Sequence, residues 1–315
     1  MKPKELGDHY ILSSSPHAHS PVGVSRIMLD VIVALLPATG CALWFFGLRA
    51  LWLIAACVST AVVAEALCRM AMKRENSVGD LSAVLTGLLL ALNLPPDLPL
   101  WMAVCGSVFA ITISKQVFGG LGYNPFNPAL AARAFMLVSF TGAMTTWGVP
   151  RGMETEAITC ATPLALIKSG NPEQLATLKN LFFGCIGGCI GETSALALLV
   201  GAAYLLFRRV ITWHIPVSFL ATVFLFALAK GGVPPLFHVL SGGAVLGACF
   251  MATDYVTSPI TAKGKLVFGV GCGLITMCIR CGNGYPEGVS FAILIMNAFT
   301  PLVNRFTQPK PFGRK

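Results

Sequence analysis

Charged residues are the scarcest class in this chain. Aspartate, glutamate, lysine and arginine together make up 11% of the 315 residues, whereas 55% of the residues are apolar. A soluble globular domain carries roughly 25% charged residues. The shortage of charge excludes an ordinary soluble domain and predicts an all-α, polytopic integral membrane protein embedded in a lipid bilayer.

Patterns typical of several other classes are also missing. The net charge is +9, but no basic stripe with interleaved aromatic residues occurs, and basic residues at the ends of membrane helices orient the protein. We therefore expect no nucleic-acid partner. Gly269, Gly271 and Gly273 follow no strand of a βαβ unit, so they do not form a dinucleotide-binding fingerprint.

The cysteines do not form a disulfide or metal framework. Eleven are scattered, mostly inside apolar runs, where cysteine acts as a small hydrophobic residue. The pair Cys278 and Cys281 has C-x-x-C spacing, but a zinc or iron–sulfur site needs four ligands and no second pair lies at a suitable distance. We expect no metal site in this chain alone, and a cluster shared with a partner subunit stays open.

Hydropathy predicts about ten membrane spans. They cover 27–46, 50–71, 79–94, 99–118, 127–141, 182–206, 213–229, 234–252, 265–281 and 287–304. Several spans are short and broken by Gly or Pro, which favours two five-helix repeats with a site at their interface. The first apolar run begins near Ile27, too late and too long for a cleaved signal, so we expect an uncleaved anchor.

Basic residues predict the orientation. With both termini in the cytoplasm, most Lys and Arg residues fall on the cytoplasmic side, as the positive-inside rule requires. The long polar loop then lies outside the cytoplasm. The resulting division is a cytoplasmic segment 1–26, a first membrane half 27–141, an extracytoplasmic loop 142–181, a second half 182–304 and a cytoplasmic tail 305–315.

Four polar motifs interrupt the apolar spans. Gly119–Ala129 contains Asn124 and Asn127 among glycines and prolines, and irregular backbone at membrane depth survives only when it is buried or lines a wet cavity. A Pro-capped loop that starts the fifth helix is the alternative. Glu192 is an ionisable residue at membrane depth, which is costly and usually functional, although a glutamate reaching the interface is also possible. The motifs around Asp254 and at 283–288 fit either ligand contacts or plain helix caps.

The loop 142–180 contains the run Glu156-Ala-Ile-Thr-Cys-Ala-Thr-Pro163. A threonine hydroxyl in such a loop can be esterified by an enzyme, and Arg151, Lys168 and Lys179 in the same loop could balance a phosphate charge. The alternative is a hydroxyl-containing turn followed by proline at the start of a short helix. The local chemistry leaves both open.

A family resemblance distinguishes between these alternatives. The runs GGLGYNPFNPALAARAF, TCATPL, IGETSAL, MATDYVTSPIT and GYPEGVSFAILIMN resemble, in order along most of the chain, the NqrB/RnfD family of membrane subunits. These subunits belong to the Rnf electron-transport complex and to the sodium-pumping NADH:quinone reductase. The resemblance implies a multi-pass subunit of the bacterial cytoplasmic (inner) membrane that works with other Rnf subunits. It would relay electrons between ferredoxin and NAD, coupled to sodium or proton movement, with no complete active site of its own.

The resemblance also implies a cofactor. The family's flavin transferase recognises a motif of the form D-x-x-S/T-G-A-T/S and joins FMN through its phosphate to the last hydroxyl. Here that hydroxyl is on Thr162, with Thr159, Ala161 and Pro163 beside it. Glu156 stands for the Asp and Cys160 for the Gly of the motif. The flavin would be extracytoplasmic, and a second, non-covalent flavin between the helices is implied by analogy.

Five further residues are candidates for function under this interpretation. Asn124, Asn127 and Arg133 would line an inner cavity, and Glu192 and Asp254 would take part in ion coupling. A passive solute channel or transporter with the same repeat fold is the alternative, and it predicts no flavin.

Overall fold

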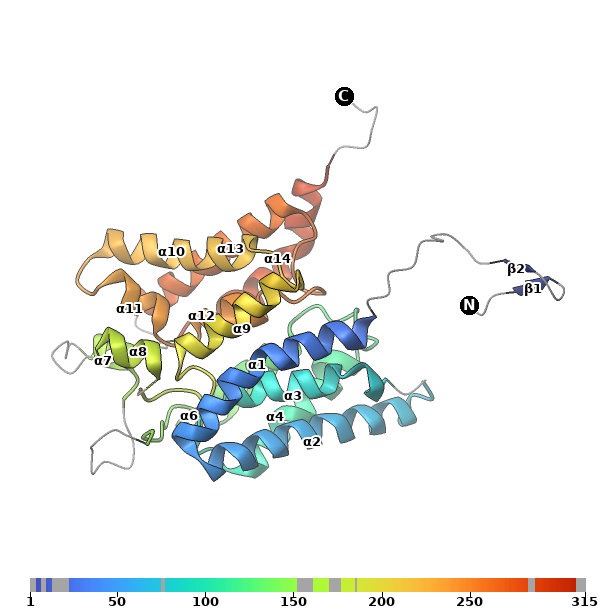
Figure 1. Ribbon diagram of the computed structural model, residues 1–315, viewed down its shortest axis with the longest axis horizontal. Helices are drawn as coiled ribbons and strands as arrows, with labels where there is room; N and C mark the ends of the chain where they lie inside the picture. The colour runs from blue at the N-terminus through green and yellow to red at the C-terminus, as the bar shows by residue number, and fades with distance from the viewer. Residues whose placement is uncertain are drawn as a thin grey trace.

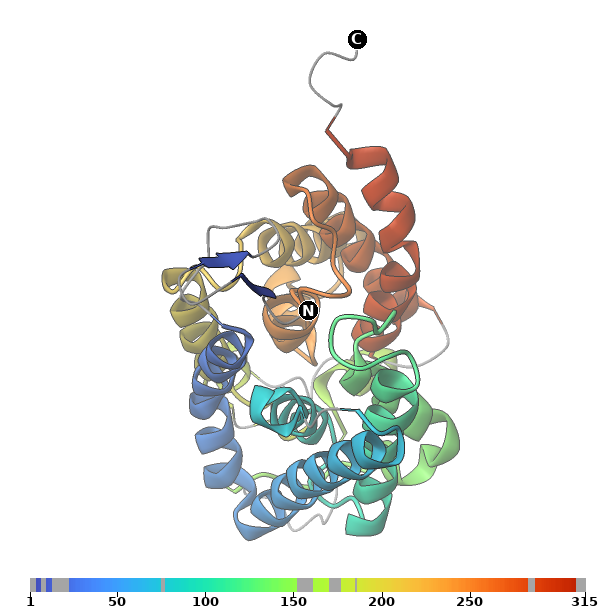
Figure 2. The ribbon, with the colours of Figure 1, turned by 90° about the vertical axis from the view of Figure 1, so that its right-hand side faces the viewer.

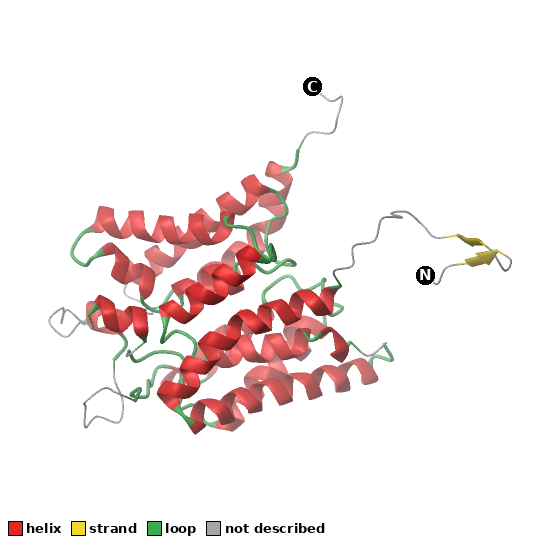
Figure 3. Ribbon diagram, viewed as in Figure 1, coloured by secondary structure: helices red, strands yellow, loops and turns green. Residues whose placement is uncertain are grey.

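The computed structural model describes residues 23–74, 77–151, 161–169, 177–184, 186–282 and 287–309, together with the backbone of 4–6 and 10–12. The two short N-terminal segments are strands β1 (Lys4–Leu6) and β2 (Tyr10–Leu12), which pair antiparallel with Glu5 opposite Ile11. The other regular elements of the described residues are helices, which are joined by loops and turns (Figure 3).

A first unit of helices comes from the N-terminal half. Its members are α1 (Val24–Phe46), α2 (Leu48–Ala71), α3 (Ser82–Leu92), α4 (Leu100–Ile111) and α5 (Pro128–Ser139). A 3-10 turn, η1 (Val78–Asp80), precedes α3; a π-helical turn, η2 (Thr112–Gln116), extends α4; and α6 (Thr141–Met144) follows α5. At about 1.5 Å per residue, the 23 and 24 residues of α1 and α2 are long enough to cross a hydrocarbon core of about 30 Å.

A second unit comes from the C-terminal half. It contains α9 (Ala195–Phe207), α10 (His214–Lys230), the pair α11 (Pro235–Leu240) and α12 (Ala244–Leu246), α13 (Ala262–Cys281) and α14 (Val289–Thr307). A π-helical turn, η4 (Gly247–Met251), continues α12. Between the units lie two short helices, α7 (Pro163–Lys168) and α8 (Leu178–Phe183).

The two units repeat the same packing pattern. In the first, α2 packs on α3 and α4, and α4 packs on α5; in the second, α10 packs on α11 and α13, and α13 packs on α14. The units meet through their first helices, α1 with α9, and through their last helices, α5 with α14 (Figure 2). This arrangement confirms the all-α membrane fold with two five-helix repeats.

Each of the ten predicted spans contains a helix, but two of them are not continuous. The predicted span 182–206 is wrong over its first half, because the described residues between α8 and Ala195 are irregular and α9 begins only there. The predicted span 234–252 is interrupted at 241–243, between α11 and α12. Glycines concentrate at both interruptions, and in the first of them the main chain bonds to a neighbouring segment instead of to its own helix.

The two ends of the helical body are formed by different elements. The first residues of α1 and the last residues of α14 lie at one end of the body, while α7, α8 and α11 lie at the other (Figure 1). Arg208 pairs with Asp30 at the first end, where Arg74 also donates to the main-chain oxygen of Gly119. The start of α1 and the end of α14 lie at the same end of the body, which agrees with the predicted topology. Which end faces the cytoplasm stays a prediction.

Candidate functional site

Several helices stop inside the body, and their ends meet. Helix α3 has only 11 residues, about half the length needed to cross a bilayer, and it ends at Asn93. The irregular segment before α9 bonds to this end: Ile190 N–H donates to the Leu94 oxygen at 3.1 Å and Gly191 N–H to the Leu92 oxygen at 2.8 Å. A Cβ on Gly191 would lie 2.6 Å from the Leu92 Cβ, so the close approach needs glycine.

Arg133 lies at the centre of this junction. It projects from α5, and its Nη1 donates to Asn93 Oδ1 at 2.6 Å and to Glu192 Oε1 at 3.2 Å. Its Nη2 donates to Cys189 Sγ at 3.3 Å and forms an ion pair with Glu287. We call these five residues the break cluster.

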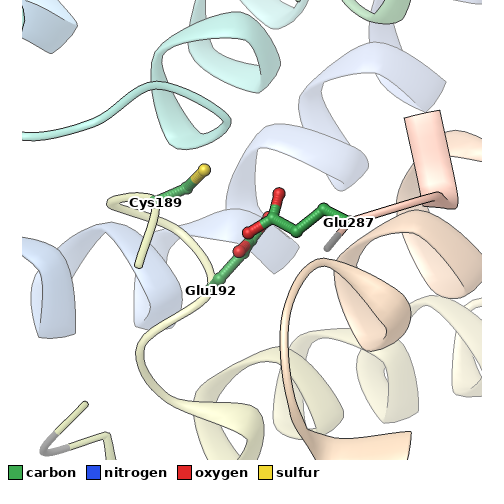
Figure 4. A group of neighbouring side chains, drawn as sticks. All are labelled: Cys189, Glu192 and Glu287. Carbon is green, nitrogen blue, oxygen red and sulfur yellow. The ribbon is translucent and has the colours of Figure 1, made fainter. Parts of the chain in front are cut away.

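The carboxyl groups of Glu192 and Glu287 approach each other, with Cys189 on the same loop as Glu192 (Figure 4). Ligand atoms of these three residues lie within 4.8 Å of one another, which is a spacing that could hold a metal ion. However, the Arg133 guanidinium already donates to all three groups, and it supplies positive charge where a cation would sit.

One oxygen of the break cluster lacks a partner. Glu192 is 3% exposed, and its Oε2 accepts no hydrogen bond from any described residue. Leaving a buried charged atom unpaired is costly, and such atoms in native proteins need an explanation. This oxygen is therefore the point at which the cluster is open to a ligand or a proton.

Thr162 lies beside the break cluster. It forms the N-cap of α7, where its Oγ1 accepts from Ala165 N–H at 3.2 Å and Pro163 occupies the first helical turn. The predicted turn-and-proline helix start is therefore confirmed as geometry. Thr162 is only 3% exposed, Pro163 is buried and Ala161 is exposed. Thr159, Glu156 and Cys160 lie outside the described residues.

The Thr162 pocket joins this threonine to the two glutamates. It has a volume of about 10 Å³, which is room for about one water molecule. Its lining consists of Thr162, Pro163, Leu164, Ile186, Gly187, Gly188, Glu192, Gly242 and Glu287. The sequence motifs around Thr162, Glu192 and Glu287 thus meet at one place, although they are far apart along the chain.

A much larger cavity lies between the two units. Its volume is about 80 Å³, which is below the range of about 300–1,000 Å³ typical of small-molecule sites. Asn124, Asn127 and Asp254 line it, as do Lys115 and Ser82. Of the three residues expected to line an inner cavity, the two asparagines line this one, whereas Arg133 lies in the break cluster.

Asn127 has two roles in the structure. Its Oδ1 caps α5 by accepting from Ala129 N–H at 3.1 Å, which confirms the Pro-capped helix start. Its Nδ2 donates to the Met251 oxygen at 3.3 Å while the residue lines the large cavity. The sequence motif allows either a helix cap or a residue that lines a cavity. In the structure Asn127 is both.

Asp254 lies in the segment between η4 and α13. Its Oδ2 accepts from Thr257 Oγ1 at 3.1 Å. Burial raises the pKa of its carboxyl group above the usual range, although hydrogen bonds from Thr257 and from nearby main-chain amides act in the opposite direction. Asp254 is separate from Glu192, so the two predicted ion-coupling residues belong to different sites.

Polar contacts connect the two sites. Glu192 contacts Arg133, Arg133 contacts Asn93, and Asn93 Nδ2 lies 3.5 Å from the sulfur of Met251. The main-chain oxygen of Met251 accepts from Asn127, which reaches the large cavity. This route crosses the interface of the two units.

The structure contains a second buried ionic network, and none of its residues is among those that the sequence predicts as functional. Lys115 Nζ donates to Glu65 Oε2 and to Ser82 Oγ, both at 2.7 Å, and Glu65 Oε1 accepts from Ser77 at 2.6 Å and Gln116 at 3.1 Å. We call these five residues the lysine cluster. Glu65 lies inside a predicted span, and that position alone could have marked it.

Asn93 and Arg280 are also absent from the predicted residues. Asn93 follows an apolar run and precedes two prolines, a pattern typical of a helix end. Arg280 lies between Cys278 and Cys281, and the sequence marks it only as one of the basic residues predicted to lie outside the cytoplasm. No spacing rule predicts that either side chain turns inward.

Comparison with known proteins identifies relatives over nearly the whole chain. A family model described as the NQR2, RnfD, RnfE family matches residues 11–313. A subunit of the Na(+)-translocating ferredoxin:NAD(+) oxidoreductase complex of Acetobacterium woodii is 52% identical over 305 residues, which cover 96% of this chain and 95% of that protein. A subunit of the proton-translocating ferredoxin:NAD(+) oxidoreductase complex of Clostridium ljungdahlii is 43% identical, with 97% of each chain covered. A subunit of the ion-translocating oxidoreductase complex of Stutzerimonas stutzeri is 41% identical, with 92% of each covered.

Proposed function

The chain belongs to the NQR2, RnfD, RnfE family, and from this membership we propose that it is the RnfD-type membrane subunit of an ion-translocating ferredoxin:NAD⁺ oxidoreductase complex. The proposal rests on one observation: subunits of two such complexes match this chain over 96% and 97% of its length. The protein works with the other subunits of the complex in the bacterial cytoplasmic membrane. Both termini face the cytoplasm and the Thr162 segment faces outward.

The proposed redox group is FMN joined by a phosphoester to Thr162. FMN, when bound, supplies one- and two-electron transfer, and the protein sets its position and potential. Thr162 shares its small pocket with the carboxylates of Glu192 and Glu287 and with no cation, so the pocket itself does not fit a phosphoryl group and the phosphate would have to lie outside it. The pocket is smaller than those that hold a drug-sized ligand, so the ring system would lie outside it.

Thr162 is buried, and this affects how it becomes modified. A threonine that is 3% exposed is out of reach of another enzyme's active site. A flavin transferase would therefore act before α7 packs against Gly242 and the segment around Gly188. Cells that express this protein need that transferase for maturation.

The large cavity is the proposed site of a second, non-covalent flavin. Its mixture of apolar walls and convergent polar groups suits a flat heterocycle, although its volume of about 80 Å³ requires neighbouring side chains to move apart when the ring binds. The amides of Asn124 and Asn127 can supply donors and acceptors for the ring edge. The polar route through Met251, Asn93 and Arg133 would then join the surroundings of the two flavins.

Ion coupling is proposed at the two acidic residues associated with these sites. Glu192 offers an unpartnered oxygen in the break cluster, and Asp254 is a half-buried carboxyl group at the large cavity. A buried carboxylate binds a proton or a cation when the charge near it becomes more negative. A flavin, when bound nearby and reduced, would supply such a change.

In-gel flavin fluorescence tests the proposal. The complex is produced together with its flavin transferase, denatured and viewed under ultraviolet light. We expect a fluorescent band for the wild-type chain and for Thr159→Ala, none for Thr162→Ala, and a gain of about 440 Da on the peptide that contains Thr162. A dark wild-type band from matured protein would refute the covalent flavin and favour a passive solute channel of the same fold.

A further inference from the structure

Three arginines line a pocket at the end of the helical body where α1 begins and α9 ends. The pocket has a volume of about 320 Å³, within the range of about 300–1,000 Å³ typical of small-molecule sites. Arg26 comes from α1, Arg208 and Arg209 follow α9, and one carboxylate, that of Asp30, lines the pocket with them. Three positive charges thus face one negative charge, which attracts an anion. We call this site the arginine pocket.

The carboxylate of the arginine pocket is already bonded. Asp30 is 7% exposed, its Oδ2 accepts from Arg208 Nη2 at 3.3 Å, and its Oδ1 accepts from Tyr204 OH at 3.1 Å. These bonds tie α1 to α9 and hold Arg208 at the wall of the pocket. Arg26 and Arg209 are exposed, and neither forms an ion pair with a carboxylate of the described chain. Two guanidinium groups, each with forked donors, are therefore available to an anion.

The surfaces that lead away from the arginine pocket are apolar. On α1, Leu29, Val33 and Leu36 follow Arg26 on one face, at steps of three and four residues, and all three are exposed. On α9, Phe207 adjoins the arginines and is 86% exposed. The two helices pack side by side (Figure 1). A cationic pocket above exposed apolar helix faces is complementary to an amphiphile with an anionic head and apolar chains.

We propose that the arginine pocket binds the phosphate of an anionic phospholipid of the surrounding bilayer, with the acyl chains along the exposed faces of α1 and α9. Arg26 and Arg209 supply charge-assisted donors to the phosphate oxygens. Basic pockets between membrane helices are typical sites for such headgroups. Because α1 belongs to the first five-helix unit and α9 to the second, the bound lipid holds the two units together at this end.

A phosphate carried by a ligand of the large cavity is a second source of the same chemistry. Ile27, Val210 and Tyr255 line both the arginine pocket and that cavity. The wall that they form is closed, because the Tyr255 hydroxyl donates to the Val210 oxygen. In contrast, Arg26 and Arg209 are exposed at the surface of the body. These contacts favour a ligand that enters from the bilayer surface.

The backbone at Arg209 allows its side chain to be tested without loss of structure. Arg209 has φ +57°, in the left-handed region that favours glycine. Its N–H donates to the Leu206 oxygen at 3.1 Å, and Val210 N–H donates to the Leu205 oxygen at 2.9 Å, which are the two bonds of a Schellman motif. Glycine is the usual residue at this position. Arg209→Gly therefore removes the charge and should not lower the stability of the folded chain.

The end of α2 supplies a matched control. Lys73 has φ +53°, its N–H donates to the Met70 oxygen at 3.1 Å, and Arg74 N–H donates to the Arg69 oxygen at 3.0 Å. Lys73 thus occupies the same position of the same motif, but it does not line the arginine pocket. Lys73→Gly makes the same change of backbone and charge away from the proposed site.

The experiment uses the purified complex in detergent, with the wild-type chain, Arg26→Gln, Arg209→Gly, these two together, or Lys73→Gly. Phosphatidylglycerol retained per chain is measured by mass spectrometry. The melting temperature is then followed as phosphatidylglycerol is added. Phosphatidylcholine, inorganic phosphate and FMN are added in separate arms, which distinguish a lipid headgroup from other sources of phosphate.

We expect phosphatidylglycerol to raise the melting temperature of the wild type and of Lys73→Gly, whereas phosphatidylcholine and inorganic phosphate should not. Arg26→Gln and Arg209→Gly should each weaken phosphatidylglycerol binding about fivefold. Their melting temperatures without added lipid should equal that of the wild type, because neither arginine has an ion pair to lose. Any effect of FMN should be the same in all variants.

Wild-type retention of phosphatidylglycerol in the double variant would overturn the assignment. An equal loss in Lys73→Gly would also overturn it, because surface charge alone would then explain the binding. Protection by FMN that disappears with the two arginines would assign them to a phosphate of the large-cavity ligand and would refute the lipid site. If Arg26→Gln does not accumulate, the comparison of Arg209→Gly with Lys73→Gly decides alone.

Discussion

The lysine cluster and the break cluster are both buried ion-pair networks, but their carboxylates differ in how fully they are bonded. In the lysine cluster both oxygens of Glu65 are bonded, Oε2 to Lys115 and Oε1 to Ser77 and Gln116. In the break cluster Glu192 Oε2 has no partner among the described residues, and two carboxylates share the cation Arg133. A carboxylate with both oxygens bonded fixes helices against each other, whereas one with an unpartnered oxygen has capacity for a proton, an ion or a ligand. The unpartnered atom of the lysine cluster is the amide oxygen of Gln116, which carries no charge. We therefore assign a structural role to the first cluster and a functional role to the second.

The largest expected effect is that of Arg133→Met. The substitution leaves Glu192 and Glu287 buried without a cation, and breaking a buried pair in this way costs about 3–5 kcal/mol. Thermal stability of the purified complex in detergent measures the loss. Glu192→Gln and Glu287→Gln in the same chain should restore much of it, and a fully stable Arg133→Met protein would contradict the described cluster.

A similar cost is expected when one partner of the lysine cluster is removed. Lys115→Met leaves the Glu65 carboxylate unpaired and should destabilise the protein by about 3–5 kcal/mol. The double variant Lys115→Met with Glu65→Leu should return near to wild-type stability, because buried pairs can often be replaced by apolar residues. If the double variant is stable yet has lost coupled ion translocation, the assignment of this cluster to structure alone is wrong.

A moderate effect is expected for Ser77→Ala. The hydroxyl of Ser77 donates to Glu65 at 2.6 Å, and a hydrogen bond to a charged group contributes about 1.5–3 kcal/mol. The loss should appear as a lower melting temperature, with the flavin fluorescence of the complex unchanged. Ser59→Ala, which removes an exposed hydroxyl bonded to its own helix, is the matched control and should have little effect.

Glu192→Gln should have the smallest effect on stability, about 1 kcal/mol or less, because Oε2 has no bond to lose and Arg133 keeps Glu287. Its effect on function should be much larger. Electron transfer by the complex should continue while ion translocation into vesicles falls. Unchanged ion translocation per electron would exclude Glu192 from the coupling step.

Much of the fold can be predicted because its signals are local. Long apolar runs such as 24–46 and 48–71 must become helices in a bilayer, where every main-chain group needs an internal partner. The start of α5 at Asn127-Pro128 and that of α7 at Thr162-Pro163 are fixed by cap chemistry within three residues. The start of α9 could not be predicted from local signals. The apolar segment before Ala195 forms main-chain hydrogen bonds with the end of α3, which is a long-range contact.

Insertion into a membrane, the course of most helices and the positions of the polar motifs are encoded locally in the amino-acid order. Hydropathy and cap chemistry depend only on neighbouring residues, so they hold before any packing is known. The meeting of Thr162, Glu192, Glu287 and Arg133 at one junction exists only in the folded molecule. Broken helices from both units must bury their ends against each other, and these residues satisfy one another across distances that no local pattern encodes.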